Sequence, residues 1–222
     1  IGNSRDITLR ALDILASANV LVAEDTRTLR RLMNIHGVSA ANRPLISYHD
    51  DSKAKVRKRL MEYIKSGKSV VYAPEAGTPL IADPGYQLSK EISDAGYLVT
   101  AAPGSSAVLS ALNVAGLPTD CFFFNGFLPT QKAARRARLK NLENIQSTLV
   151  FYESPKRLSS MLRDACDTLG RDRSAAYCRE MTKKFEEVHR GSLSALYDHV
   201  ADRSIKGEIV VIINRAEKRS VN

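Results

Sequence analysis

Two adjacent carboxylates, Glu24 and Asp25, follow a short apolar run and are followed in turn by Arg27. The run Val20–Ala23 is typical of a buried strand, so these side chains are expected where that strand ends. Ligands of open α/β sheets bind at this end of the strands, and a carboxylate there can accept a proton. The same residues also fit a helix N-terminus capped by Asp25. The sequence leaves both interpretations open.

A second loop with this composition contains Glu75, Ala76, Gly77 and Thr78. It follows the predicted strand at 69–73 and precedes a predicted helix. Because Ala76 and Gly77 carry little side chain, their backbone N–H groups could approach a ligand closely. A plain strand-to-helix turn is an equally good interpretation.

The arrangement occurs again after the predicted strand at 97–101, where Gly104 precedes Ser105, Ser106 and Ala107. These residues could contact a ligand, but serine here is more often the cap of the helix that follows.

Lys183 follows the predicted strand at 175–178 and lies close in sequence to Glu180. A lysine beside a carboxylate can take part in proton transfer or orient a phosphate. An ordinary surface ion pair is the commoner alternative.

The elements that would position these residues alternate between short apolar runs and helical periods. This alternation predicts an α/β fold with a largely parallel sheet and helices on both faces. In the first half we expect strands at 20–23, 45–48, 69–73 and 97–101, and helices at 6–18, 52–66 and 84–95, with Ser52 as a helix cap.

Glycine and proline at 116–120 stop a helix and mark the best linker. Two α/β domains, 1–117 and 118–222, are therefore expected, with a ligand cleft between them. The second should contain strands at 122–124, 148–152, 175–178 and 208–213, helices at 131–145 and 155–169, and a segment at 186–191 that could pair antiparallel.

The net charge of +9 suits a polyanionic partner such as nucleic acid. One basic stretch at 131–140 includes Lys132, Arg135 and Arg136, and a second lies at 53–59. Phosphate contact and a solvated helix face are about equally good interpretations of such runs.

Several classes of site lack their usual signals. The three cysteines are dispersed and the four histidines show no ligand spacing, so we expect no metal, no disulfide and a reducing, cytoplasmic setting. No apolar run is long enough to span a membrane. The glycine-rich motifs of dinucleotide and ATP sites and of ordinary Rossmann methyltransferases are missing as well.

Taken together, the short motifs resemble one family: the small-subunit ribosomal RNA cytidine 2′-O-methyltransferases of the tetrapyrrole methylase (class III methyltransferase) superfamily. The matching stretches occur in order along essentially the whole chain: 1–3, 23–27, 76–81, 83–85, 103–104, 115–118, 126–129, 151–155, 179–183 and 207–208.

The resemblance implies that S-adenosyl-L-methionine binds between the two domains. Its pocket would include Glu75, Thr78, Ser106 and Ala107 from the first domain and Tyr152, Cys178 and Gly207 from the second, with Ala76 and Gly77 in the same loop. Glu24, Asp25 or Lys183 would assist proton removal or orientation, and Arg27, Lys132, Arg135 and Arg136 would contact RNA phosphates.

The implied substrate is a cytidine ribose near the decoding centre of 16S rRNA in the 30S subunit, and the implied assembly is a homodimer. A class III methyltransferase acting on a tetrapyrrole or protein side chain, and a non-catalytic RNA-binding relative, are the alternatives. Three departures accompany the resemblance: Glu75 stands where the family usually has Asp, and the family has a further strand before Ile1 and a helical extension after Asn222.

Overall fold

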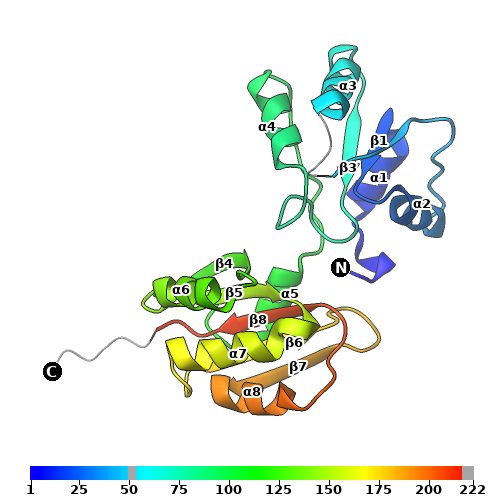
Figure 1. Ribbon diagram of the computed structural model, residues 1–222. Coiled ribbons are helices and arrows are strands. Elements are labelled where there is room, and N and C mark those ends of the chain that lie inside the picture. Colours follow the sequence, from blue (N-terminus) through cyan, green and yellow to red (C-terminus); the bar gives the residue numbers. More distant parts are fainter. Residues whose placement is uncertain (50–53, 217–222) are drawn as a thin grey trace. The chain divides into compact units, whose positions relative to one another are not determined.

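The computed structural model describes residues 1–49 and 54–216, which form two compact units, 1–106 and 107 onward (Figure 1). Ser52 and Lys53, which the sequence placed in a helix cap and a basic cluster, lie outside the described residues. The units divide earlier in the chain than the expected linker at 116–120. The helix at 107–115 lies between residue 106 and the expected linker, and it packs on strands of the second unit.

The first unit contains a parallel sheet in the order β2 (Leu45–Ser47), β1 (Val20–Ala23), β3 (Val70–Ala73). Strand β1 is central and fully buried, as expected for an apolar run covered on both faces. Its register brings Ala23 opposite both Ser47 and Ala73, so the loops after all three strands begin at one edge of the sheet.

Helices cover both faces of this sheet, as the sequence predicted. Alternate side chains of β1 point to opposite faces. Leu21 and Ala23 pack against α1 (Leu9–Ser17) and α2 (Thr26–Ile35), whereas Val20 and Val22 pack against α3 (Ala54–Lys65) and α4 (Tyr86–Asp94). A single turn of 3₁₀ helix, η1 (Ser4–Asp6), precedes α1.

The strand predicted at 97–101 is wrong. These residues form no strand, and Leu98 is 90% exposed. A strand needs a neighbour to satisfy its backbone N–H and C=O groups. Within the described ranges, β3 pairs with β1 alone and no strand pairs with 97–101.

The second unit is built on a mixed sheet in the order β4–β5–β8–β6–β7. Strands β4 and β5 are parallel, and the other neighbours are antiparallel. The predicted antiparallel segment is confirmed as β7. The strands are β4 (Phe122–Phe127), β5 (Thr148–Glu153), β6 (Ser174–Arg179), β7 (Glu187–Ser192) and β8 (Ile209–Ile213).

One face of this sheet carries the large core of the unit. Helices α6 (Lys132–Leu142), α7 (Pro155–Leu169) and α8 (Leu193–Ala201) pack there on Leu149, Phe151 and Val211. The opposite face is in contact with α5 (Ala107–Ala115), which packs on β6 and β8 and thereby joins the second unit. Helix α8 was not predicted, although Ser192 caps it by accepting a hydrogen bond from the Ala195 N–H.

Helices α6 and α7 are joined by a buried ion pair. Nη2 of Arg135 lies 2.6 Å from Oδ2 of Asp164, and the two side chains are 6% and 2% exposed. Arg135 also donates to the Thr130 carbonyl. A charge buried to this degree is tolerated because it is paired and hydrogen-bonded.

Replacing Asp164 with alanine should leave the Arg135 guanidinium buried without its counterion. We expect the free energy of unfolding to fall by about 3–5 kcal/mol, the usual cost of breaking a buried pair from one side. Urea denaturation followed by circular dichroism measures the loss.

Asp167→Ala provides the control, because Asp167 joins the same two helices through Arg136 but both of these side chains are about 40% exposed. Its loss should be below about 1 kcal/mol. Equal losses for the two variants would contradict the role given to the buried pair.

Candidate functional site

The two acidic loops of the first unit meet at the edge of the sheet. Glu24 follows β1 and Glu75 lies two residues beyond β3, and the Glu75 N–H donates to Oε2 of Glu24 at 3.2 Å. The parallel register of β1 and β3 brings them together, since neighbouring parallel strands end at the same edge. Within the described residues, Oε1 of Glu24 makes no hydrogen bond.

Asp25 caps helix α2, which is the helix-start interpretation left open by the sequence. Its carboxylate accepts hydrogen bonds from the Arg27 and Thr28 N–H groups and pairs with the Arg27 guanidinium at 2.9 Å. The Arg27 hydrogen bonds lower the pKa of Asp25 to about 2. Because its proton affinity is so low, Asp25 is a weak base at neutral pH.

The loop at 75–78 packs against the segment that ends the first unit. Thr78 Oγ1 donates to the Ser105 carbonyl at 3.1 Å. Gly77 has φ +75°, and a Cβ there would lie 3.0 Å from Ile1 Cγ2 and 3.3 Å from the Ser105 carbonyl oxygen. Only glycine fits this backbone without strain or displacement of its neighbours. The predicted residues Glu75, Ala76, Gly77 and Thr78 thus form one defined loop, and Ser106 ends the unit.

Two of the predicted residues of the second unit share one row of its sheet. Tyr152 on β5 and Cys178 on β6 both lie opposite Val210 of the central strand β8. Directly opposed residues of antiparallel strands point to the same face, so the two side chains share the face that α5 contacts. The ring of Tyr152 also packs against Phe124 and Phe127, at centroid distances of 4.9 and 5.6 Å.

The Cys178 thiol is buried beneath α5, the helix that begins at Ala107. Its Sγ donates to the Ala111 carbonyl at 3.9 Å. Burial raises the pKa of Cys178 to about 11. The side chain therefore stays protonated at neutral pH and lines this face as a small, weakly polar group.

Gly207 lies in the turn before β8 and faces Glu180. A Cβ on Gly207 would fall 2.5 Å from the Glu180 side chain, so that space is already filled. Glu180 Oε1 accepts hydrogen bonds from the Glu208 N–H and from Lys183 Nζ, at 3.0 and 2.9 Å.

Lys183 is engaged by two carboxylates, those of Glu180 and Glu208, at 2.9 and 2.8 Å. Partial burial would lower the pKa of Lys183, but these hydrogen bonds outweigh it and raise the pKa above its ordinary value. A lysine acts as a base only when its pKa is depressed, so this geometry favours a positioning role.

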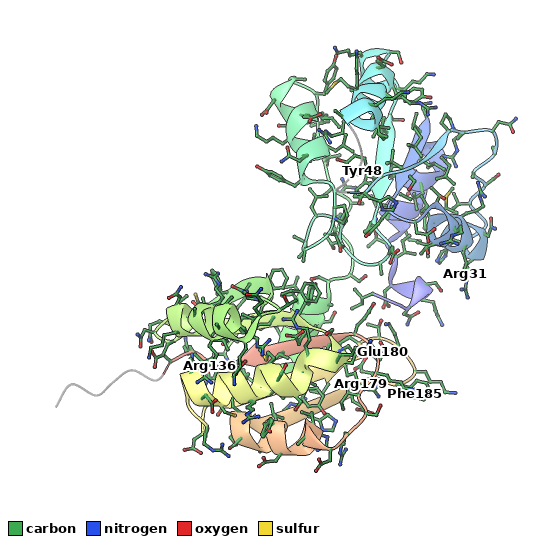
Figure 2. All side chains as sticks on the ribbon, in the orientation of Figure 1. Arg31, Tyr48, Arg136, Arg179, Glu180 and Phe185 are labelled. Atoms are coloured by element: carbon green, nitrogen blue, oxygen red, sulfur yellow. The ribbon has the colours of Figure 1, made fainter. Side chains whose placement is uncertain are left out.

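The four predicted RNA-contacting side chains differ in their availability. Arg27 is 89% exposed although it pairs with Asp25, and Lys132 at the start of α6 is exposed. Arg136 is partly exposed and pairs with Asp167 (Figure 2). Arg135 requires a correction: it is buried against Asp164, so its guanidinium is not available to a phosphate.

Sequence reasoning missed the role of Glu153 and Arg157 in the motif at 151–155. Glu153 is buried, accepts from the Ser154 N–H and pairs with Arg157, whose Nη2 donates to the carbonyls of Leu128 and Pro129. Burial raises the pKa of Glu153. The pair thereby links two of the matching motifs, 151–155 and 126–129. The four-residue spacing of Glu153 and Arg157 at a helix start is the sequence signal that could have indicated this ion pair.

Within 1–49 and 54–216, no group of three or more His, Cys, Asp or Glu side chains could hold a metal ion. None of the helices in those ranges has the length and apolar content to cross a membrane.

The sequence is similar over nearly its full length to proteins named ribosomal RNA small subunit methyltransferase I. The chain is 44% identical over 221 residues to ribosomal RNA small subunit methyltransferase I of Mesorhizobium japonicum, covering 99% of this chain and 74% of the relative. The Bacillus subtilis protein of the same name is 37% identical over 222 residues, covering 100% and 75%. The Mycobacterium tuberculosis H37Rv protein of that name is 44% identical over 213 residues, covering 96% and 74%.

Solved structures share the fold at low sequence identity. A cobalt precorrin-4 methyltransferase matches with a TM-score of 0.69 and 16% identity, covering 96% of this chain and 90% of that chain. Uroporphyrin-III C-methyltransferase from Thermus thermophilus, solved with S-adenosyl homocysteine, matches with a TM-score of 0.59 and 15% identity, covering 95% and 92%. These likenesses confirm the predicted α/β fold of the class III methyltransferases.

The family model for tetrapyrrole (corrin/porphyrin) methylases matches residues 1–197, which is most of the chain. With relatives above 30% identity over nearly its full length, the chain belongs to the tetrapyrrole (corrin/porphyrin) methylase family.

Proposed function

We propose that this protein transfers a methyl group from S-adenosyl-L-methionine to the 2′-hydroxyl of a cytidine ribose in small-subunit (16S) rRNA. The observation that carries the proposal is the 44% identity, over 99% of the chain, to a ribosomal RNA small subunit methyltransferase. The 30S subunit as acceptor, the cytoplasm as compartment and the homodimer as assembly belong to the same proposal and rest on the resemblance.

The donor groups of the two units suit this cofactor. Backbone N–H groups of Ala76 and Gly77 can bind its carboxylate, and the Glu75 carboxylate can accept from its hydroxyl or ammonium groups. In the second unit, the partly exposed ring of Tyr152 offers an aromatic surface for an adenine ring, and the buried side chains of Val210 and Cys178 lie in the same row of the sheet. The remaining proposed contacts are Thr78, Ser106, Ala107 and Gly207.

When bound, S-adenosyl-L-methionine supplies an electrophilic methyl group on a sulfonium. The protein must hold the ribose oxygen in line and exclude water. Glu24 is the best-placed proton acceptor of the three proposed, because Oε2 is fixed by the Glu75 N–H while Oε1 makes no hydrogen bond within the described part of the chain. Asp25 and Lys183 are committed to a helix cap and to an ion-pair cluster.

Gly77→Ala should weaken cofactor binding, because the added Cβ meets Ile1 and Ser105 at a position with φ +75°. We expect the dissociation constant for S-adenosyl-L-methionine to rise about tenfold or more in isothermal titration, as a loss of about 1.4 kcal/mol would produce. Gly67→Ala is the matched control, since Gly67 has φ +79° and no atom within 4 Å of an added Cβ. Wild-type affinity in Gly77→Ala would rule out this loop as the cofactor loop.

Substitution of the three candidate bases separates their roles. At saturating cofactor and 30S subunits, Glu24→Gln should lower the single-turnover rate of methyl transfer by about 10²–10⁴-fold, the usual contribution of general base catalysis. Asp25→Asn and Lys183→Met should leave that rate within about tenfold of wild type, because these groups act by positioning. A full rate in Glu24→Gln would exclude Glu24 as the base.

Arg27 and Lys132 should each contribute to the salt dependence of RNA binding. Replacing either with alanine should reduce the slope of log affinity against log salt by about 0.7–0.9, the value for one lost phosphate contact. Filter binding of 30S subunits at several salt concentrations measures it. Lys90→Ala is the control, because Lys90 is ion-paired on α4 and is not assigned to RNA. An unchanged slope removes the substituted residue from the RNA surface.

A further inference from the structure

The loop between β6 and β7, residues 180–186, holds an exposed aromatic ring on a highly constrained backbone. The Phe185 side chain is 62% exposed. Figure 2 shows it pointing away from the body of the second unit, at the end where Arg179 and Glu180 lie. Single exposed apolar residues are common, but Phe185 stands on a loop in which two residues other than glycine have positive φ.

Two residues of this loop adopt left-handed backbone conformations without being glycine. Glu180 has φ +51° and Thr182 has φ +66°. Such conformations are strained for residues other than glycine and persist where surrounding contacts impose them, as they often do at functional sites.

Contacts from the neighbouring turn supply that constraint. The Glu180 N–H donates to the Glu208 carbonyl at 2.9 Å, and the Glu208 N–H donates back to Glu180 Oε1 at 3.0 Å. The exchange requires Gly207, because a side chain there would collide with Glu180. Lys183 Nζ donates hydrogen bonds to the carboxylates of both Glu180 and Glu208. The backbone N–H of Lys183 donates to the Glu180 carbonyl.

The base of the loop is held as well. Arg179 makes a two-pronged contact with the Glu187 carboxylate, at 3.2 and 2.7 Å, and donates to the Lys206 carbonyl at 2.9 Å. At residues 182–186, which we call the β6–β7 tip, the Thr182 N–H donates to the Glu186 carboxylate. The β6–β7 tip is thus preorganised, and a preorganised ring loses little conformational entropy when it binds.

An exposed ring, Phe185, and an exposed cation, Lys184, lie side by side in this loop and together suit an anionic, aromatic partner. The four surrounding carboxylates, Glu180, Glu186, Glu187 and Glu208, are each engaged within the loop and its neighbours. Lys184 is exposed, with Nζ 5.5 Å from the Phe185 ring centroid, and no carboxylate of the described residues lies within ion-pair distance of it. An unstacked nucleobase fits the ring and its phosphate fits the lysine.

We propose that the β6–β7 tip is an RNA-binding element in which Phe185 stacks on an unpaired base of the substrate RNA and Lys184 contacts the adjacent phosphate. This proposal rests on the proposed rRNA substrate. It gives that RNA a contact surface outside the residues assigned to the cofactor. A second copy of the chain could also cover Phe185, and the experiment separates that outcome.

The test measures binding of the chain to 30S subunits and to a fluorescein-labelled single-stranded RNA. Phe185→Ala should weaken both about tenfold, the effect expected for one stacking aromatic, whereas Phe185→Tyr should retain affinity. Lys184→Ala should lower the salt slope on the single strand by about 0.7. Tyr86→Ala is the matched control, because Tyr86 on α4 is also 62% exposed and should not affect binding.

Titration with S-adenosyl-L-methionine and sedimentation velocity are run on every variant. Unchanged cofactor affinity and oligomeric state, together with the loss of RNA affinity, support the proposal. Wild-type RNA affinity in Phe185→Ala overturns it, as does dissociation of an oligomer, which would assign Phe185 to an interface between copies. Absence of 30S methylation by the wild-type chain would count against the proposed function, while the RNA-binding comparison would still decide the role of Phe185.

Discussion

Strand β8 is the element on which the second unit depends. Its five residues, Ile209–Ile213, are all apolar and all buried, and they pair with β5 on one side and β6 on the other. A strand of apolar, β-branched residues buries all its side chains only at the centre of a sheet whose two faces are both covered. This last strand therefore unites elements that are far apart in the chain, and it places Tyr152 and Cys178 on either side of Val210.

The position of β8 also determines the turn before it. Gly207 and Glu208 lie next to the end of β6, where their backbone meets Glu180. That contact maintains the left-handed conformation of Glu180, which in turn orients Lys183 and the loop. The central strand β8 thus positions both the sheet face with the proposed cofactor residues and the loop that carries Phe185. Hydrogen bonding between neighbouring strands aligns the strands and also brings the turns at their ends together.

Burial divides the basic residues into two groups with different roles. Lys132 and Arg135 lie within one turn of α6, yet Lys132 is exposed while Arg135 is enclosed with Asp164. The buried guanidinium stabilises the contact between two helices, and the exposed ammonium remains free to meet a phosphate. The Arg135–Asp164 pair adds nothing to the net charge of +9, so that excess of positive charge is carried by other side chains.

The sequence by itself determined the family, the α/β class, the buried strand β1 and the helix α7, because hydrophobic period, proline and glycine act over a few neighbouring residues. Likewise, the polar loops after β1 and β3 could be predicted to lie at the ends of those strands, and the structure brings the two loops together. Only the tertiary structure decided that Asp25 caps a helix, that 97–101 forms no strand, that Arg135 is buried and that Lys183 sits between two carboxylates. Each of these depends on a pairing partner or a burial that the local sequence does not specify. Strand pairing, ion-pair geometry and a shifted pKa are properties of residues brought together from distant parts of the chain.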